Sequence, residues 1–65
     1  MKIVLNGEPV EIHAETLDRA LEELGYENAV VATAINNEFV PAPMRAETPI
    51  SEDDRIEIIA PMKGG

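Results

Sequence analysis

The sequence predicts a single α+β domain, in which one helix packs across one face of a mixed sheet of four to five strands. Apolar residues recur at every second position in several short segments, one segment has helical spacing, and turn residues separate the segments. With 65 residues and a hydrophobic share of 45%, the chain can bury one small aliphatic core. The expected order is a hairpin, a helix and then two further strands with irregular connections.

A β-hairpin is expected at the start of the chain. Residues 2–5 and 9–13 are rich in strand-forming residues, and Asn6-Gly7 lies between them. Asn-Gly favours a tight hairpin turn because both residues accept a positive φ. Pro9 has no N–H to donate, so it fits the first residue of the second strand.

The helix is predicted over residues 17–24. Four apolar residues fall at positions i, i+3, i+4 and i+7, which gives the helix one apolar stripe: Leu17, Ala20, Leu21 and Leu24. The hydroxyl of Thr16 is expected to accept a hydrogen bond from a free N–H of the first turn. Gly25 follows as a residue that can adopt the left-handed conformation and end the helix.

Residues 29–35 form an uninterrupted run of small and β-branched residues, which predicts a strand in the middle of the sheet with both faces buried. Asn36-Asn37 predicts a turn, and residues 38–40 a short strand that ends at Pro41. The three prolines between residues 41 and 49 predict an irregular crossing segment.

The last strand is predicted over residues 55–59, after a turn at residues 51–54. Alternation places Ile56 and Ile58 on the core side and Ile59 on the opposite side. If the first and last strands lie side by side in the centre of the sheet, as in a β-grasp, the chain leaves the sheet from its middle. We therefore expect a globular domain at residues 1–59 and a flexible tail at residues 60–65.

The composition excludes several classes of partner. Asp and Glu number 13 against 5 for Lys and Arg, and the net charge of −8 disfavours nucleic acid and anionic membranes. The charge is explained either by attraction to a basic partner or by solubility alone. The chain has no cysteine for disulfides, and its first apolar run is too short for a signal peptide or a membrane span, so a cytoplasmic location is expected.

Catalysis by this chain alone is not expected. Its single histidine, His13, falls in a strand without a nearby serine or cysteine, which favours a surface position. Residues 52–54 form an acidic turn and lack the alternating ligand pattern of a metal loop. No glycine-rich phosphate loop precedes a helix. The residues themselves therefore supply no credible catalytic group or phosphate-binding loop.

The chain ends in Gly64-Gly65, a pair that packing does not explain. Glycine has no Cβ, so two glycines make a thin strand that can enter a narrow channel. The six residues 60–65 reach at most about 20 Å when extended. The terminal carboxylate is a poor electrophile. To become an acyl donor it must be converted to a mixed anhydride or a thioester, which requires ATP and a second protein. The alternative is that the terminus is frayed and has no function.

Several motifs along the whole chain resemble the ThiS family, the sulfur carriers of thiamine biosynthesis within the ubiquitin-like β-grasp superfamily. The shared motifs run from the first hairpin to the terminus: Asn6-Gly7, Thr16-Leu17, Ala34-Ile35-Asn36, Val40-Pro41 and Gly64-Gly65. The chain departs from the family at Asp53, where a glycine is common, and at Ala42, where a basic residue is frequent. Because Asp tolerates the left-handed region, the turn at Asp53 is expected to persist.

The resemblance implies a protein co-substrate without a bound cofactor. An E1-like adenylyltransferase of the ThiF type would use ATP and Mg²⁺ to form an acyl-adenylate at Gly65, with Gly64 as its steric partner. A cysteine desulfurase would supply the sulfur that gives a thiocarboxylate, and a thiazole synthase of the ThiG type would receive it.

Docking of these partners is expected on an apolar patch near the tail, with four candidate residues: Phe39, Ile59, Pro61 and Met62. The alternative is that Phe39 and Ile59 fill the edge of the core. Lys63 is expected either to meet an acidic patch on the partner or to remain solvated.

Related functions remain open from the sequence. Carriers for molybdopterin, tRNA thiolation, and cysteine or methionine synthesis also end in Gly-Gly on this fold, although the short length and the Ile-Asn and Val-Pro dipeptides favour thiamine. From other classes, a ubiquitin-like protein modifier or a plain interaction module is possible.

Overall fold

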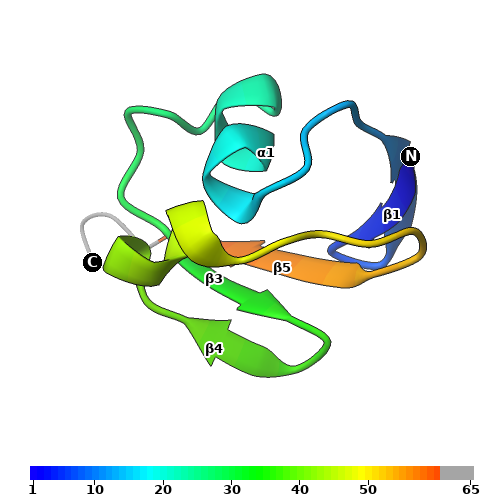
Figure 1. The fold of residues 1–65 in the computed structure, drawn as a ribbon. Coiled ribbons are helices and arrows are strands. Elements are labelled where there is room, and N and C mark those ends of the chain that lie inside the picture. The colour runs from blue at the N-terminus through cyan, green and yellow to red at the C-terminus, as the bar shows by residue number, and fades with distance from the viewer. Residues whose placement is uncertain (61–65) are drawn as a thin grey trace.

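A computed structural model describes residues 1–60 of the chain. The elements follow in the order β1 (Lys2–Leu5), β2 (Glu8–Glu11), α1 (Leu17–Glu23), β3 (Ala32–Ile35), β4 (Glu38–Val40), the 3₁₀ helix η1 (Ala42–Glu47) and β5 (Arg55–Ile59). Figure 1 shows α1 on one side of the sheet formed by the strands. The α+β class is confirmed.

The sheet has five strands in the order β2-β1-β5-β3-β4. β1 and β5 are parallel neighbours near its centre, and the other three pairs are antiparallel. The expected β-grasp arrangement, with the first and last strands side by side, is therefore confirmed. It places the end of β5, and with it the root of the tail, in the middle of the sheet (Figure 1).

The core lies between α1 and the sheet. Ile3, Leu17 and Ile56 are completely buried, and together with six other aliphatic residues they form one cluster: Ile12, Ala20, Leu21, Val40, Ile50 and Ile58. The predicted apolar stripe faces this cluster, although α1 ends one residue earlier than predicted and Leu24, its C-cap, is only half-buried.

Positive φ angles occur in the turns where the sequence predicts them. Asn6 and Gly7 have φ values of 49° and 88°, and Asn36 and Asn37 have values of 51° and 73°. Asp53, with a φ of 69°, holds the left-handed position in the turn before β5. Asp tolerates this region because its short side chain can hydrogen-bond locally.

The predicted second strand is shifted and too long. β2 covers Glu8–Glu11, so Pro9 is its second residue, in an edge strand. After Ile12 the chain leaves the sheet because the backbone N–H groups of His13 and Ala14 donate to the Glu23 carboxylate, at 2.9 Å each to Oε1.

Both ends of α1 show how the helix is closed. At the C-terminus, Gly25 has a φ of 92°, and the N–H of Tyr26 donates to the Leu21 carbonyl at 2.8 Å, as in a Schellman motif. At the N-terminus the predicted capping bond is wrong: the Thr16 hydroxyl donates to Asp18 Oδ1 at 2.6 Å. The N–H of Arg19, the third helical residue, donates instead to Asp18 Oδ1 at 2.8 Å, and the N–H of Leu17 donates to the Thr48 carbonyl at 2.9 Å.

The expectation that residues 29–35 are buried on both faces is wrong. β3 covers only Ala32–Ile35, and although it lies inside the sheet between β5 and β4, Ala32 is exposed. Thr33 on the other face is buried. The reason is that one helix can cover only one face of the sheet.

The crossing segment is more regular than its prolines suggest, because η1 occupies Ala42–Glu47. Arg45 anchors it to β3 and to the residue before that strand, since Nε donates to Thr33 Oγ1 at 3.1 Å and a terminal guanidinium nitrogen donates to the Val31 carbonyl at 2.7 Å. Within residues 1–60, no helix is long and apolar enough to cross a membrane.

Candidate functional site

The tail that the sequence singles out begins directly after β5. Ile59, the last residue of this strand, pairs with Ala32 of β3. The predicted reactive residue Gly65, its neighbour Gly64 and the candidate contacts Pro61, Met62 and Lys63 lie outside the described residues. The candidate site is therefore built from the surface that surrounds the root of the tail.

The sheet has an open face, which we define as the side away from α1 at Ala32, Ala34, Phe39, Glu57 and Ile59. The register places these residues together, because Ala34 pairs with both Phe39 and Glu57, and Ala32 pairs with Ile59. Residues that pair across neighbouring strands project from the same face. The alternate positions are the buried residues of the core side, such as Thr33, Val40 and Ile58.

Two of the predicted docking residues lie on this open face. The exposed fraction is 69% for Phe39 and 62% for Ile59. The alternative that they fill the edge of the core is therefore wrong. Large apolar side chains that are exposed together, instead of singly, are typical of interaction surfaces.

A shallow apolar depression of about 300 Å³ lies beside Ile59 and is lined by Val30, Val31, Ala32 and Ile59. Val30 is the most exposed large apolar residue of the described chain, at 80%. The sequence does not single out Val30, because a run of β-branched residues does not show which of them precede the strand. Its exposure extends the apolar surface at the root of the tail.

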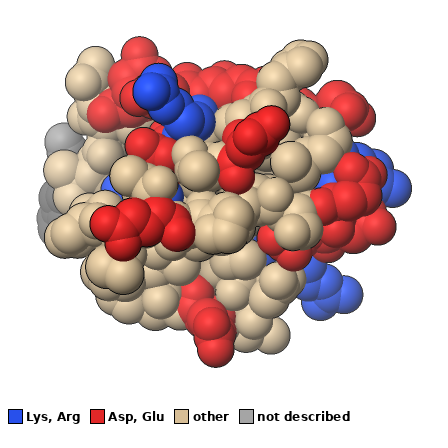
Figure 2. Space-filling model, in the orientation of Figure 1, with Lys and Arg blue, Asp and Glu red and all other residues tan. Residues whose placement is uncertain are grey.

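Charges on the open face are balanced, unlike those of the chain as a whole. The pairs Lys2–Glu11 and Val4–Arg55 place Lys2, Glu11 and Arg55 on the same side of the sheet as Glu57. This side therefore carries two basic and two acidic residues from the strands. The full chain has a net charge of −8, and acidic side chains are spread over the side shown in Figure 2. The excess negative charge therefore lies on the helix side and in the loops.

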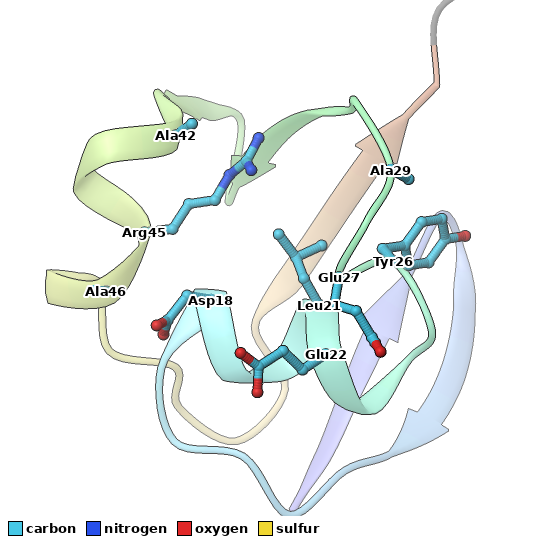
Figure 3. A pocket seen from close by; sticks show the side chains of 9 residues that line it. All are labelled: Asp18, Leu21, Glu22, Tyr26, Glu27, Ala29, Ala42, Arg45 and Ala46. Atoms are coloured by element: carbon cyan, nitrogen blue, oxygen red, sulfur yellow. The ribbon is translucent and has the colours of Figure 1, made fainter.

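A second depression, of about 290 Å³, lies between α1, the loop after it and η1 (Figure 3). Asp18, Glu22 and Glu27 contribute carboxylates to its lining, and Arg45 extends from η1 toward β3. The hydrogen bond from the Thr16 hydroxyl lowers the pKa of Asp18. No nucleophile paired with a base lines this depression, so it offers no machinery for acyl or phosphoryl transfer.

His13 lies on the surface, as predicted, with 91% of its side chain exposed. Its Nδ1 is 3.0 Å from Oε2 of Glu23, and hydrogen bonds from the backbone N–H and the ring of His13 lower the pKa of Glu23. The contact ties the end of α1 to the segment after β2. Across residues 1–60, no group of three His, Cys, Asp or Glu side chains could hold a metal ion.

The chain is similar to one protein family and to individual proteins of known function. The model of the ThiS family matches residues 3–65. The sulfur carrier protein ThiS of Thermus thermophilus is 38% identical over 61 residues, which cover 94% of this chain and 95% of that protein. A thiazole synthase of Paramagnetospirillum magneticum is 38% identical over 66 residues, but this chain spans only 20% of its length.

The crystal structure of a thiamine biosynthesis protein, ThiS, from Geobacter metallireducens superposes with a TM-score of 0.84 at 26% identity, over all of both chains. A solution structure of a thiamine biosynthesis protein from the same organism has the same fold, with a TM-score of 0.80 at 22% identity. The match to the family model covers nearly the whole chain, and the fold agrees with it. The chain is a homologue of the ThiS sulfur carriers and belongs to the ThiS family.

Proposed function

We propose that this chain carries sulfur for thiazole formation in thiamine biosynthesis, as a thiocarboxylate at Gly65. The carboxylate of Gly65 attacks the α-phosphorus of ATP on an E1-like adenylyltransferase, and pyrophosphate leaves. A persulfide supplied by a cysteine desulfurase then attacks the acyl carbon, and AMP leaves. Cleavage of the sulfur–sulfur bond by a thiol reductant gives the thiocarboxylate.

Membership of the ThiS family and similarity to the Thermus thermophilus carrier support this function. The acceptor is proposed to be a thiazole synthase of the ThiG type. Support for it comes from the Paramagnetospirillum magneticum thiazole synthase, since one fifth of that protein is similar to the whole of this chain. The need for activation supports an adenylyltransferase as partner, because a carboxylate must be activated before sulfur can displace an oxygen from it. A desulfurase is proposed as the source of that sulfur.

The observation that carries the proposal is the position of the apolar open face at the root of the tail. Phe39 and Ile59 are exposed on it, and Val30 lines the depression beside Ile59. A partner that covers this face holds the end of β5 at its surface, so that residues 60–65 can reach about 20 Å into its channel. Contact with the partner would thus explain why these apolar side chains are exposed, which the stability of the fold does not explain.

The chain acts in this scheme as a co-substrate and not as an enzyme. Its described residues offer no nucleophile with an activating base, and the depression beside α1 is bordered by carboxylates. ATP and Mg²⁺ belong to the adenylyltransferase, so the carrier itself needs no bound cofactor. We place the reaction in the cytoplasm, where ATP is available.

Intact-mass spectrometry tests the proposal. The carrier is incubated with the adenylyltransferase, ATP, Mg²⁺, the desulfurase and cysteine. Its mass should increase by the difference between a sulfur and an oxygen atom, and the change should map to the C-terminal peptide. Deletion of Gly65 is the matched control: it should abolish the change and leave thermal unfolding as in the wild type, because the core lies within residues 3–58.

An unchanged mass of the wild-type carrier in this mixture would contradict the proposal. An isopeptide adduct on a lysine of another protein would favour a ubiquitin-like modifier. A thiocarboxylate that persists when thiazole synthase and its other substrates are added would favour another sulfur acceptor.

A further inference from the structure

Asn6 takes an unusual position next to β5. β1 pairs with β5 at Val4–Arg55 and Leu5–Ile56, and the chain then turns away at Asn6 and Gly7, whose φ values are positive. The backbone of β1 therefore ends its pairing before it reaches Ile58. At Ile58, the side chain of Asn6 replaces it.

The amide of Asn6 forms two hydrogen bonds with the backbone of Ile58. The N–H of Ile58 donates to Oδ1 of Asn6 at 3.0 Å, and Nδ2 of Asn6 donates to the carbonyl of Ile58 at 3.2 Å. A primary amide has the same donor and acceptor groups as a peptide unit. The side chain of Asn6 thus pairs with β5 as one more strand residue would.

The spacing of the donors shows the same continuity. The N–H of Val4 donates to the Asp54 carbonyl and the N–H of Asn6 donates to the Ile56 carbonyl, both at 2.9 Å. The next carbonyl on that side of β5 is the one of Ile58, because alternate residues of a strand direct their backbone groups to opposite neighbours. Nδ2 of Asn6 reaches this carbonyl.

The end of β5 is held from both sides, and Asn6 provides one of the two contacts. On one side Ile59 pairs with Ala32 of β3, and on the other side Asn6 holds Ile58. The residue after Ile59 is the first of the tail. Without the Asn6 amide, the N–H and the carbonyl of Ile58 would have no hydrogen-bond partner from the β1 side.

We propose that Asn6 is a positioning residue for the reaction at Gly65: its amide fixes the direction in which the tail leaves the sheet and enters the channel of the adenylyltransferase. This inference rests on the proposed function. Binding of the open face to the partner does not depend on Asn6, whereas the productive placement of the tail does. A displaced tail should therefore lower kcat of adenylation more than it changes KM.

The second hairpin supplies a matched control. Asn37 has a φ of 73° in the turn between β3 and β4, and its side chain makes no hydrogen bond within residues 1–60. Asn6→Gly and Asn37→Gly both place glycine at a positive φ, which glycine adopts without strain. Only Asn6→Gly removes a contact with β5.

The experiment measures two quantities on each variant: amide hydrogen exchange at Ile56 and Ile58, and the steady-state kinetics of adenylation with the carrier as the varied substrate. For Asn6→Gly we expect faster exchange at Ile58 with protection retained at Ile56. We also expect a decrease in kcat of about tenfold, because small errors in the placement of a reacting group are costly. KM should stay within about twofold of the wild type, since the open face is unchanged, and Asn37→Gly should match the wild type in all of these.

Asn6→Asp is the second variant. It keeps an oxygen that accepts from the N–H of Ile58 and loses the donor to the Ile58 carbonyl, so its kcat should lie between those of the wild type and Asn6→Gly. If Asn6→Gly loses protection at Ile58 but keeps the kcat of the wild type, the positioning role is wrong. A rise in KM with unchanged kcat would overturn it as well, because it would assign Asn6 to docking. A wild-type carrier that is not adenylated at all would overturn the proposed function, and the role of Asn6 with it.

Discussion

The two faces of the sheet differ in what their apolar residues do. On the face covered by α1, Ile3 and Ile56 are completely buried and belong to the core. On the open face, Phe39 and Ile59 are 69% and 62% exposed. Adjacent residues of the same strand, such as Ile58 and Ile59, therefore serve different ends: one stabilises the fold, and the other is available to a partner.

The comparison shows that the apolar content of this chain is larger than its core requires. Removal of a buried side chain leaves a cavity, whereas removal of an exposed one leaves none. Stability alone thus explains Ile56 and Ile58, but it does not explain Phe39, Ile59 or Val30. Substitutions on the two faces should therefore differ in their effect on the free energy of unfolding.

The largest difference is expected between Ile56→Ala and Ile59→Ala. Ile56 is completely buried in the core, so its truncation should lower the free energy of unfolding by about 2–5 kcal/mol. Ile59→Ala, the matched control on the open face, should change it by less than about 0.5 kcal/mol. Both values are measured by urea denaturation, with unfolding monitored by circular dichroism. Equal losses would show that the open face is covered in the free protein.

A smaller loss is expected for Thr33→Val, on the covered face. The Thr33 hydroxyl is buried, donates to the Val40 carbonyl at 2.8 Å and accepts from Arg45 Nε at 3.1 Å. Valine has a similar shape and leaves both partners without this contact, so unfolding should become easier by about 1–2 kcal/mol. Thr48→Val is the control, because its hydroxyl bonds the Met44 carbonyl at an exposed position. If Thr48→Val cost as much as Thr33→Val in the same urea titration, burial would not set the value of the Thr33 hydroxyl.

The next prediction concerns the pH dependence of stability at the end of α1. Hydrogen bonds from His13 hold the pKa of Glu23 below its ordinary value in the folded protein. A carboxylate whose folded pKa is depressed stabilises the protein above its unfolded pKa, and this contribution is lost as the pH falls through the folded pKa. Glu23→Gln should therefore lower the midpoint of thermal unfolding at neutral pH and have a smaller effect in acid.

Glu22→Gln, on the same helix, is the matched variant for this measurement. It leaves the hydrogen bonds of Glu23 with His13 and Ala14 in place. The loss of stability on acidification should therefore persist in this variant. A pH profile of Glu23→Gln that parallels the wild type would contradict the role given to Glu23.

Much of the fold could be predicted from the sequence because its signals are local. Asn6-Gly7 and Asn36-Asn37 mark their turns through the conformations that these residues accept, and the alternation in residues 55–59 fixes which isoleucines face the core. The Gly64-Gly65 terminus and the family motifs direct attention to the tail without any knowledge of the structure.

The features that the sequence did not predict depend on contacts between distant segments. Whether the second face of β3 is buried depends on the number of layers in the domain, which no property of residues 29–35 specifies. The N–H of Leu17, at the start of α1, donates to the carbonyl of Thr48 in a distant segment of the chain. Likewise, the contact of Asn6 with Ile58 joins residues 52 positions apart.

The most direct test of the central claim is the rate of adenylation of Ile59→Glu, measured beside its urea denaturation. Ile59 is exposed at the root of the tail, so the free energy of unfolding should stay within about 0.5 kcal/mol of the wild type. A carboxylate placed in an apolar interface has no partner there, and kcat/KM for adenylation should therefore fall by at least about tenfold. A variant that folds normally and is adenylated at the rate of the wild type would show that the open face does not meet the adenylyltransferase.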